Sequence, residues 1–177
     1  APHSRAFRIL WVLEECGAAY ERVPHNLRAN TQKAPEFLAI NPDGKLPVLE
    51  DRGPDGDWTG VVVTESTAIC AYLANVTGAL APAPGTPARA AYETYLAYGG
   101  SVLEPAMAEV AFPRKEAPPA MALGWPPFAD ALARVERQIT STGGPYLLGQ
   151  DFTMADAMCG GLLRFAAGFG MFKPGPV

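Results

Sequence analysis

A turn that leads into a proline-entered strand is the sequence feature that most constrains the fold. Residues 41–44 hold two turn-forming dipeptides, Asn-Pro and Asp-Gly, because proline fixes its φ and glycine accepts a positive φ. A short apolar strand, Val48-Leu49, follows and is entered through Pro47. Since proline has no N–H to donate to a ladder, Pro47 suits a strand start, a sheet edge or a tight cis turn. A cis Leu46–Pro47 bond would turn the N–H and C=O of Leu46 away from the sheet, towards another extended backbone such as a peptide ligand.

A second stretch further along the chain complements this turn. Glu65-Ser66 lies where the β pattern of Val61–Val63 ends and a helical pattern begins. A helix N-terminus binds anions through its free N–H groups and a nearby hydroxyl. A backbone clamp beside an anion pocket is what an acidic tripeptide requires.

These residues resemble the glutathione site of the glutathione S-transferases. In that family the residue before a cis-proline grips the cysteinyl backbone, and an acidic residue followed by serine takes the γ-glutamyl end. The resemblance extends over the chain: residues 3–15 look like the first helix of a fungal and bacterial branch, and residues 149–157 look like the family's C-terminal capping motif. By these three stretches in the family's order, the sequence is identified as a member of the family.

The resemblance implies a set of glutathione-binding residues. Leu46 and Pro47 would hold the cysteinyl backbone, and Glu65 with Ser66 would hold the γ-glutamyl group. Lys45 matches a basic or polar position that holds the glycyl carboxylate in related classes. The alternative is that Lys45 is an ordinary surface lysine with no role in binding.

Thiolate activation requires hydrogen-bond donors and positive potential aimed at the glutathione sulfur. The expected helix over residues 5–16 offers its N-terminal amides and dipole, and the Ser4 hydroxyl is the candidate catalytic donor. An ordinary N-cap is the equal alternative for Ser4. In several serine-type classes the activating serine lies earlier, at the position of Ala1, which has no donor. His3, a backbone amide and a residue before Ala1 are the other candidates.

The resemblance implies a glutathione transferase that conjugates the thiolate to small hydrophobic electrophiles or reduces peroxides, as in detoxification. The alternative is a non-catalytic glutathione-binding or regulatory protein of the same fold. A thiol–disulfide oxidoreductase would need a cysteine near His3, and the sequence has none there. We expect no metal, because His3 and His25 do not cluster with cysteines.

The chain divides at a proline-rich linker. The predicted order of elements in residues 1–77 is α-β-α-β-β-α. The family's thioredoxin-like fold begins with one more strand, and we expect that strand to precede Ala1. Residues 78–87 form the linker, and residues 88–177 form an all-α domain whose last helices we expect to lie beyond this sequence. The expected elements are helices over 5–16, from Pro35, from Ser66 to Gly78, from about Ala88 to a kink or end at Pro105, over 128–142 and from Thr153, with strands at Tyr20–Val23, Val48-Leu49 and Val61–Val63.

Composition narrows the list of partners. The chain has 177 residues, a net charge of −4 and 49% hydrophobic residues, so it can bury a core and lacks the basic surface that nucleic-acid binding needs. No apolar stretch is long enough to span a bilayer. We expect a cytoplasmic homodimer that takes glutathione as co-substrate together with a small apolar electrophile. The residues expected to offer apolar surface to that electrophile are Tyr92, Tyr95, Tyr98, Met107 and Phe112. For most of them a place in the core is the equal alternative.

Overall fold

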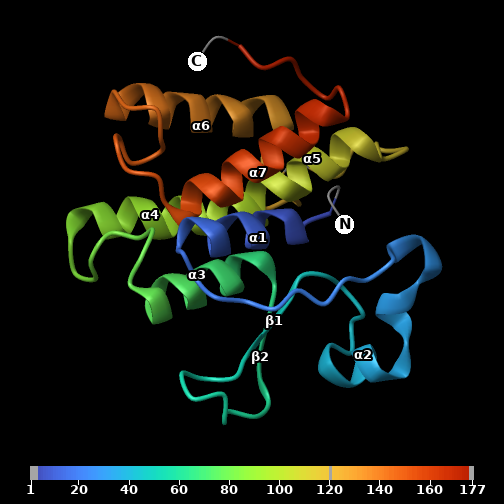
Figure 1. Ribbon diagram of the computed structural model, residues 1–177. Helices are drawn as coiled ribbons and strands as arrows, with labels where there is room; N and C mark the ends of the chain where they lie inside the picture. The colour runs from blue at the N-terminus through green and yellow to red at the C-terminus, as the bar shows by residue number, and fades with distance from the viewer. Residues whose placement is uncertain (1–3, 120, 176–177) are drawn as a thin grey trace. The chain divides into compact units, whose positions relative to one another are not determined.

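The computed structural model describes residues 4–119 and 121–175, which fall into two compact units, Ala1–Ala79 and Leu80–Val177 (Figure 1). The first unit combines helices with a small sheet, and the second is helical. This is the fold expected from the sequence: a thioredoxin-like N-terminal region followed by a helical C-terminal region. The boundary between the units falls within the proline-rich stretch at residues 78–87.

The first unit is built from five main elements. Helix α1 packs side by side with α3, and α3 also contacts β2. Strands β1 and β2 form an antiparallel two-stranded sheet. The bounds are α1 Ala6–Glu15, α2 Pro35–Ile40, β1 Val48–Asp51, β2 Val61–Thr64 and α3 Ser66–Thr77, with two 3₁₀ turns at Leu27–Ala29 and Thr31–Lys33.

Local sequence chemistry accounts for these elements. Pro35 takes the first turn of α2, where its missing N–H leaves no hydrogen bond unmade. Helix α3 ends at Gly78, which adopts φ +67° as its C-cap. Its buried face includes Ile69, Cys70 and Leu73, as the helical spacing predicts. The predicted hairpin and the helices beginning at Pro35 and Ser66 are therefore confirmed.

Two predictions for the first unit are wrong. The segment Tyr20–Val23 is not a strand, because no strand lies beside it among the described residues and a strand requires a hydrogen-bonded neighbour. Helix α1 covers Ala6–Glu15, within one residue of the expected range at each end, but Arg5 rather than Ser4 occupies its N-cap position. Ser4 is therefore not the N-cap of this helix.

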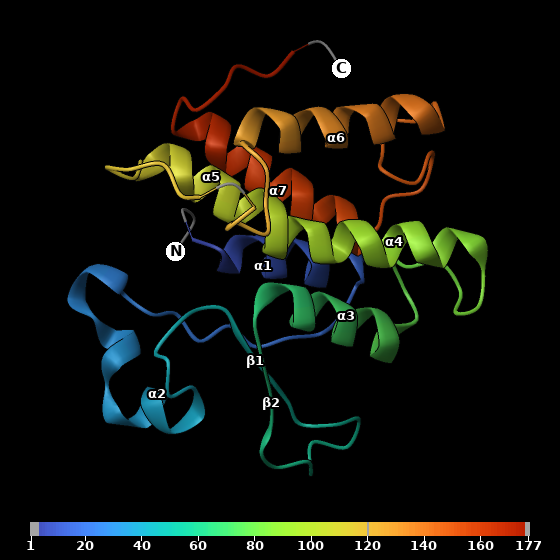
Figure 2. The same ribbon diagram turned by 180° about the vertical axis from the view of Figure 1, so that it is seen from behind.

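The second unit contains a long helical run and two further helices (Figure 2). The run consists of α4 Pro87–Tyr98, a π-helical turn η3 at Gly99–Leu103 and α5 Glu104–Ala111. Helix α6 covers Phe128–Thr142 and α7 covers Met154–Gly168. Both α4 and η3 pack on α7, and α5 packs on α6.

The π turn explains why Pro105 does not end the helical run. In an unbroken α-helix the proline ring would clash with the carbonyl four residues earlier, here that of Ser101. The wider turn at η3 directly precedes α5, and Pro105 lies in the first turn of α5. The sequence predicted a kink or an end at this position, and the structure shows the π turn followed by continued helix.

The start of α7 is set by a buried capping box, as the sequence predicts. Thr153 is the N-cap residue, and the Asp156 carboxylate accepts hydrogen bonds from the Thr153 N–H at 2.9 Å and from its hydroxyl at 2.7 Å. The first N–H of the helix, from Met154, donates to the Leu80 C=O at 2.9 Å. This end of α7 is thus tied to the chain that enters the second unit.

Among the described residues, none of the helices is both long and apolar enough to cross a membrane.

Candidate functional site

The turn before β1 is held from inside by one buried side chain. Asn41 is only 4% exposed, its Nδ2 donates to the Lys45 C=O at 2.9 Å, and its Oδ1 accepts from the Asp43 N–H at 3.2 Å. Gly44 adopts φ +57° and is buried in the turn. The turn therefore presents Lys45 and Leu46 from a fixed backbone.

The Leu46–Pro47 peptide bond is cis, which is one of the arrangements that a proline before a strand suits. Pro47 is buried, Leu46 is half-buried and Lys45 is exposed. Within the part of the chain that the structure describes, no hydrogen bond joins the N–H or C=O of Leu46 to another residue. Those two backbone groups are available to an extended ligand.

Glu65 and Ser66 form the junction between β2 and α3. Glu65 has φ +65° and ψ 125°, an unusual conformation for a residue with a Cβ, and it occupies the N-cap position of α3 without a side-chain cap bond. Its side chain is exposed, whereas Ser66, the first residue of the helix, is 8% exposed. Because the first N–H groups of a helix have no partners within it, this junction can receive an anionic group.

The sheet register brings the two stretches together. Val48 pairs with Thr64 across the antiparallel ladder. Opposed residues in such a ladder have Cα atoms about 4.5–5.5 Å apart, so the turn that ends at Pro47 lies beside the junction that begins at Glu65. Four predicted site residues, Leu46, Pro47, Glu65 and Ser66, thus lie at the same end of the hairpin.

Lys33, which was not among the predicted site residues, also contacts this turn. Its Nζ donates to the Asp43 C=O at 2.7 Å, and its side chain covers Gly44 so closely that a Cβ there would lie 2.6 Å from Nζ. Lys33 and Lys45 thus place two cations at one turn. Lys33 lies in the polar stretch 25–34, where spacing alone gives no sign of a contact with residues 43–44.

Ser4 precedes α1, and its C=O accepts a hydrogen bond from the Phe7 N–H at 3.0 Å. Arg5 is exposed, whereas Arg8 is 4% exposed. Burial raises the pKa of the nearby Cys70 thiol to about 12, and the positive charge of Arg8 opposes that rise. Ala1 and His3 lie outside the described residues.

The aromatic residues expected to line an electrophile site are mostly core. Tyr92, Tyr95, Tyr98 and Met107 are at most 6% exposed, whereas Phe112 is 82% exposed. The spacing that suggested a binding surface is the spacing of the faces of α4 and α5 that pack inside the second unit. The first four are therefore core, which was the equal alternative for most of these residues, and Phe112 alone among the five offers an exposed apolar surface.

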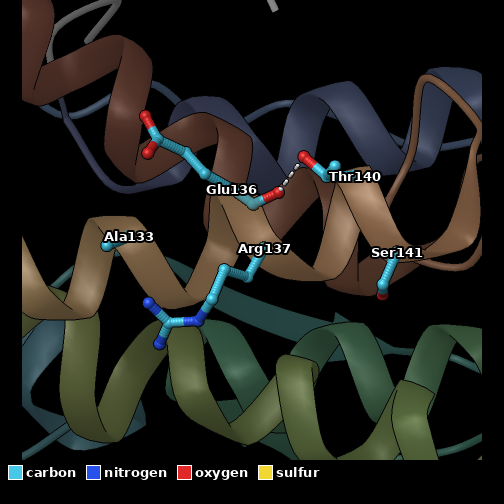
Figure 3. A pocket seen from close by; sticks show the side chains of 5 residues that line it. All are labelled: Ala133, Glu136, Arg137, Thr140 and Ser141. Atoms are coloured by element: carbon cyan, nitrogen blue, oxygen red, sulfur yellow. Dashed lines mark hydrogen bonds between the residues drawn. The ribbon is translucent and has the colours of Figure 1, made fainter.

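A hollow of about 550 Å³ lies along α6 in the second unit, and none of its lining residues is a predicted site residue. Figure 3 shows the Thr140 hydroxyl bonded to the backbone of its own helix, at 2.8 Å from the Glu136 C=O. The Ser141 hydroxyl bonds the Gln138 C=O in the same way. These two hydroxyls already have backbone partners, which leaves Glu136 and Arg137 as the charged side chains of the hollow. Its lining residues are Ala133, Glu136, Arg137, Thr140 and Ser141.

Sequence comparison identifies the family to which this architecture belongs. The family described as "Glutathione S-transferase, N-terminal domain" matches residues 1–75. Glutathione S-transferase 3 of Zea mays is 31% identical over 161 residues, which cover 85% of this chain and 68% of that protein. The chain belongs to the glutathione S-transferase family.

Other relatives of this glutathione S-transferase family member carry different activities in their names. The disulfide-bond oxidoreductase YfcG of Escherichia coli (strain K12) is 30% identical, with 90% of this chain and 74% of that protein covered. Maleylacetoacetate isomerase of Rhizobium meliloti is 39% identical over 84 residues, which cover 48% of this chain and only 36% of the isomerase. Membership of the family therefore does not by itself assign a reaction to this chain.

Solved structures agree with the family fold. A glutathione transferase homolog from Lodderomyces elongisporus superposes with a TM-score of 0.75 at 23% identity, covering 99% of this chain and 83% of that one. A glutathione transferase from Burkholderia graminis, solved with two glutathione molecules per subunit, gives a TM-score of 0.67 at 28% identity, covering 92% of this chain and 68% of that one.

The described residues contain no group of three or more histidine, cysteine or acidic side chains that would hold a metal ion. What the site does offer is free backbone groups at Leu46, an acidic side chain at Glu65, a helix N-terminus at Ser66 and two lysines at the turn. Together these groups complement a small zwitterionic peptide.

Proposed function

We propose that this protein binds glutathione and transfers its thiolate to a small apolar electrophile, or uses the thiol to reduce a peroxide. The observation that carries the proposal is the Val48–Thr64 pairing, which places Leu46-Pro47 beside Glu65-Ser66 in a member of the glutathione S-transferase family. The Burkholderia graminis relative with bound glutathione supports the choice of ligand.

In this proposal the Leu46 backbone pairs with the cysteinyl residue of glutathione. Its N–H donates to the cysteinyl C=O and its C=O accepts from the cysteinyl N–H, as one strand adds to another. Pro47 completes the clamp by leading the chain directly into β1. This contact orients the ligand without depending on the identity of the Leu46 side chain.

The γ-glutamyl end of glutathione carries both an ammonium and a carboxylate. The exposed Glu65 carboxylate attracts the ammonium, and the Ser66 hydroxyl with the first N–H groups of α3 binds the carboxylate. At the other end of the ligand, Lys45 supplies the charge for the glycyl carboxylate. In this proposal each charged end of the tripeptide thus meets a protein group of opposite charge.

The proposed transfer reaction requires the thiolate form of glutathione. Its thiol has an ordinary pKa of about 8.5, and lowering that pKa to about 6.5 takes roughly 2.7 kcal/mol of selective thiolate stabilisation. The N-terminal amides of α1 supply positive potential, and the Ser4 hydroxyl is the proposed donor to the sulfur. We further propose a cytoplasmic homodimer that acts in detoxification.

The test is retention on immobilised glutathione, followed by conjugation of a generic aryl halide. Ser66→Ala should weaken retention, and Ser4→Ala should retain the ligand but conjugate more slowly. An unchanged rate in Ser4→Ala clears Ser4 of a catalytic role, and a wild-type chain that is not retained contradicts the proposal.

The second candidate is a protein that binds glutathione without turnover. It is favoured by Ala1, which has no donor where several related classes place their activating serine. Retention of the wild-type chain without conjugation of the aryl halide and without peroxide reduction would select this alternative.

A further inference from the structure

The buried Asn41 side chain contacts the peptide unit from which the proposed ligand contact is made. Its Nδ2 donates to the Lys45 C=O at 2.9 Å. That carbonyl belongs to the peptide bond between Lys45 and Leu46, so Asn41 and the Leu46 N–H act on the same planar group.

Peptide geometry couples the two sides of this unit. The Lys45–Leu46 bond is trans, and in a planar trans peptide the C=O and the N–H point in opposite directions. Once Asn41 holds the Lys45 C=O towards the interior of the turn, the Leu46 N–H must point away from it. A hydrogen bond to the carbonyl also polarises the peptide and strengthens its N–H as a donor.

The remainder of the turn has its own supports. The Lys33 Nζ holds the Asp43 C=O at 2.7 Å. A Cβ on Gly44 would lie 2.9 Å from the Gln32 C=O, so the turn rests directly on the preceding 3₁₀ segment. Loss of the Asn41 donor therefore frees one peptide unit while these other contacts persist.

We propose that Asn41 is a positioning residue that aims the Leu46 N–H at the cysteinyl carbonyl of glutathione. The inference rests on the proposed function, since it concerns the same clamp. It assigns a role in affinity to a side chain that does not itself touch the ligand.

The direct test is Asn41→Asp in the full 177-residue chain. Aspartate keeps an oxygen to accept from the Asp43 N–H, but its carboxylate cannot donate to the Lys45 C=O. We expect the dissociation constant for reduced glutathione, measured by calorimetry, to rise about 5–10-fold, the usual effect of one lost hydrogen bond. In ¹⁵N spectra the Leu46 amide should lose its response to glutathione, while the Ser66 amide still responds.

The matched control is Tyr72→Phe, which removes a hydrogen bond of 2.7 Å to Asp51 in the same unit without touching the turn. It should lower the melting temperature but leave the dissociation constant and the Leu46 response unchanged. If Tyr72→Phe weakens binding as much as Asn41→Asp does, Asn41 acts only through general stability and the inference fails.

The outcomes separate this inference from the proposed function. A wild-type chain that binds no glutathione overturns both. A wild-type chain that binds, together with an Asn41→Asp variant that binds equally well, overturns only the role of Asn41.

Should Asn41→Asp not fold, hydrogen exchange in the wild-type chain tests the Leu46 contact that Asn41 is proposed to aim. The Leu46 amide should exchange with solvent quickly in the free protein and slowly with saturating glutathione. A Leu46 amide that ignores glutathione while the Ser66 amide responds overturns the proposed Leu46 contact and, with it, the role of Asn41.

Discussion

The N–H of Leu147 donates a hydrogen bond of 2.7 Å to the carboxylate of Asp156, the same carboxylate that caps α7. Both residues are buried, at 1% and 8% exposure. The Asp156 side chain thus accepts hydrogen bonds both from the N-cap residue of α7 and from the loop that precedes the helix.

Replacing Asp156 by alanine should therefore cost more than the loss of a helix cap. The change removes the cap and leaves the buried Leu147 N–H without an acceptor, so we expect the free energy of unfolding to fall by roughly 3 kcal/mol. Urea denaturation measures the change. Asp151→Ala, which removes an exposed carboxylate nearby, is the control and should stay within about 0.5 kcal/mol of wild type. Equal effects of the two substitutions would contradict the role given to Asp156.

Gly99 in the π turn packs closely against α7. A Cβ at this position would lie 3.1 Å from the Cβ of the fully buried Met158, which cannot move aside as a flexible side-chain end would. Gly99→Ala should lower the free energy of unfolding by about 1 kcal/mol. Gly160→Ala is the matched control within α7, because a Cβ there meets nothing within 4 Å. Gly160→Ala should raise the free energy of unfolding by about 0.5–1 kcal/mol. If Gly99→Ala also raises it, Gly99 does not pack closely against Met158.

The buried Cys70 thiol predicts a pH dependence of stability. Its pKa rises from 9.0 to about 12 through burial, partly offset by Arg8. Because the folded pKa is the higher one, this contribution is fully present below pH 9 and is lost as the pH rises towards 12. Between pH 9 and about pH 10 wild type should lose about 1 kcal/mol more than Cys70→Ala does, measured by denaturation at each pH. Parallel curves for the two proteins would rule out a buried, protonated thiol.

The Arg114 guanidinium holds the beginning of the loop that follows α5. Its Nε donates to the Glu109 carboxylate at 2.8 Å, and this hydrogen bond lowers the pKa of Glu109. Any stability from the pair is present above the ordinary glutamate pKa and is lost as the pH falls through the lowered value. In ¹³C titrations, Arg114→Gln should raise the Glu109 pKa. Lys115→Gln, which removes a neighbouring charge, should leave the Glu109 pKa unchanged. A Glu109 pKa that is unchanged in both variants would contradict the pairing of Glu109 with Arg114.

Local chemistry made much of the fold predictable. Pro35 opens α2, Gly78 closes α3, and Thr153 with Asp156 starts α7, each through contacts within a few residues along the chain. The site stretches were predictable for the same reason, since the turn before Pro47 and the junction at Glu65 are each encoded locally.

Contacts between distant segments were not predictable from spacing. Tyr20–Val23 has the composition of a strand but lacks a strand beside it among the described residues, and composition cannot supply a neighbour. Helical spacing marked Tyr92 and Phe112 alike, yet the first is 0% exposed and the second 82%, because tertiary packing decides which face of a helix is covered. The sequence indicated only that Asn41 forms a turn. The hydrogen bond from its side chain to the Lys45 C=O is a contact of the folded chain that spacing does not reveal.

The central claim is that one end of the hairpin binds glutathione. Titration of the ¹⁵N-labelled chain with reduced glutathione tests it most directly. The account predicts saturable shifts of the Leu46 and Ser66 amides, and loss of the Ser66 response in Glu65→Ala. Absence of any saturable shift, or shifts confined to the hollow along α6, would contradict it.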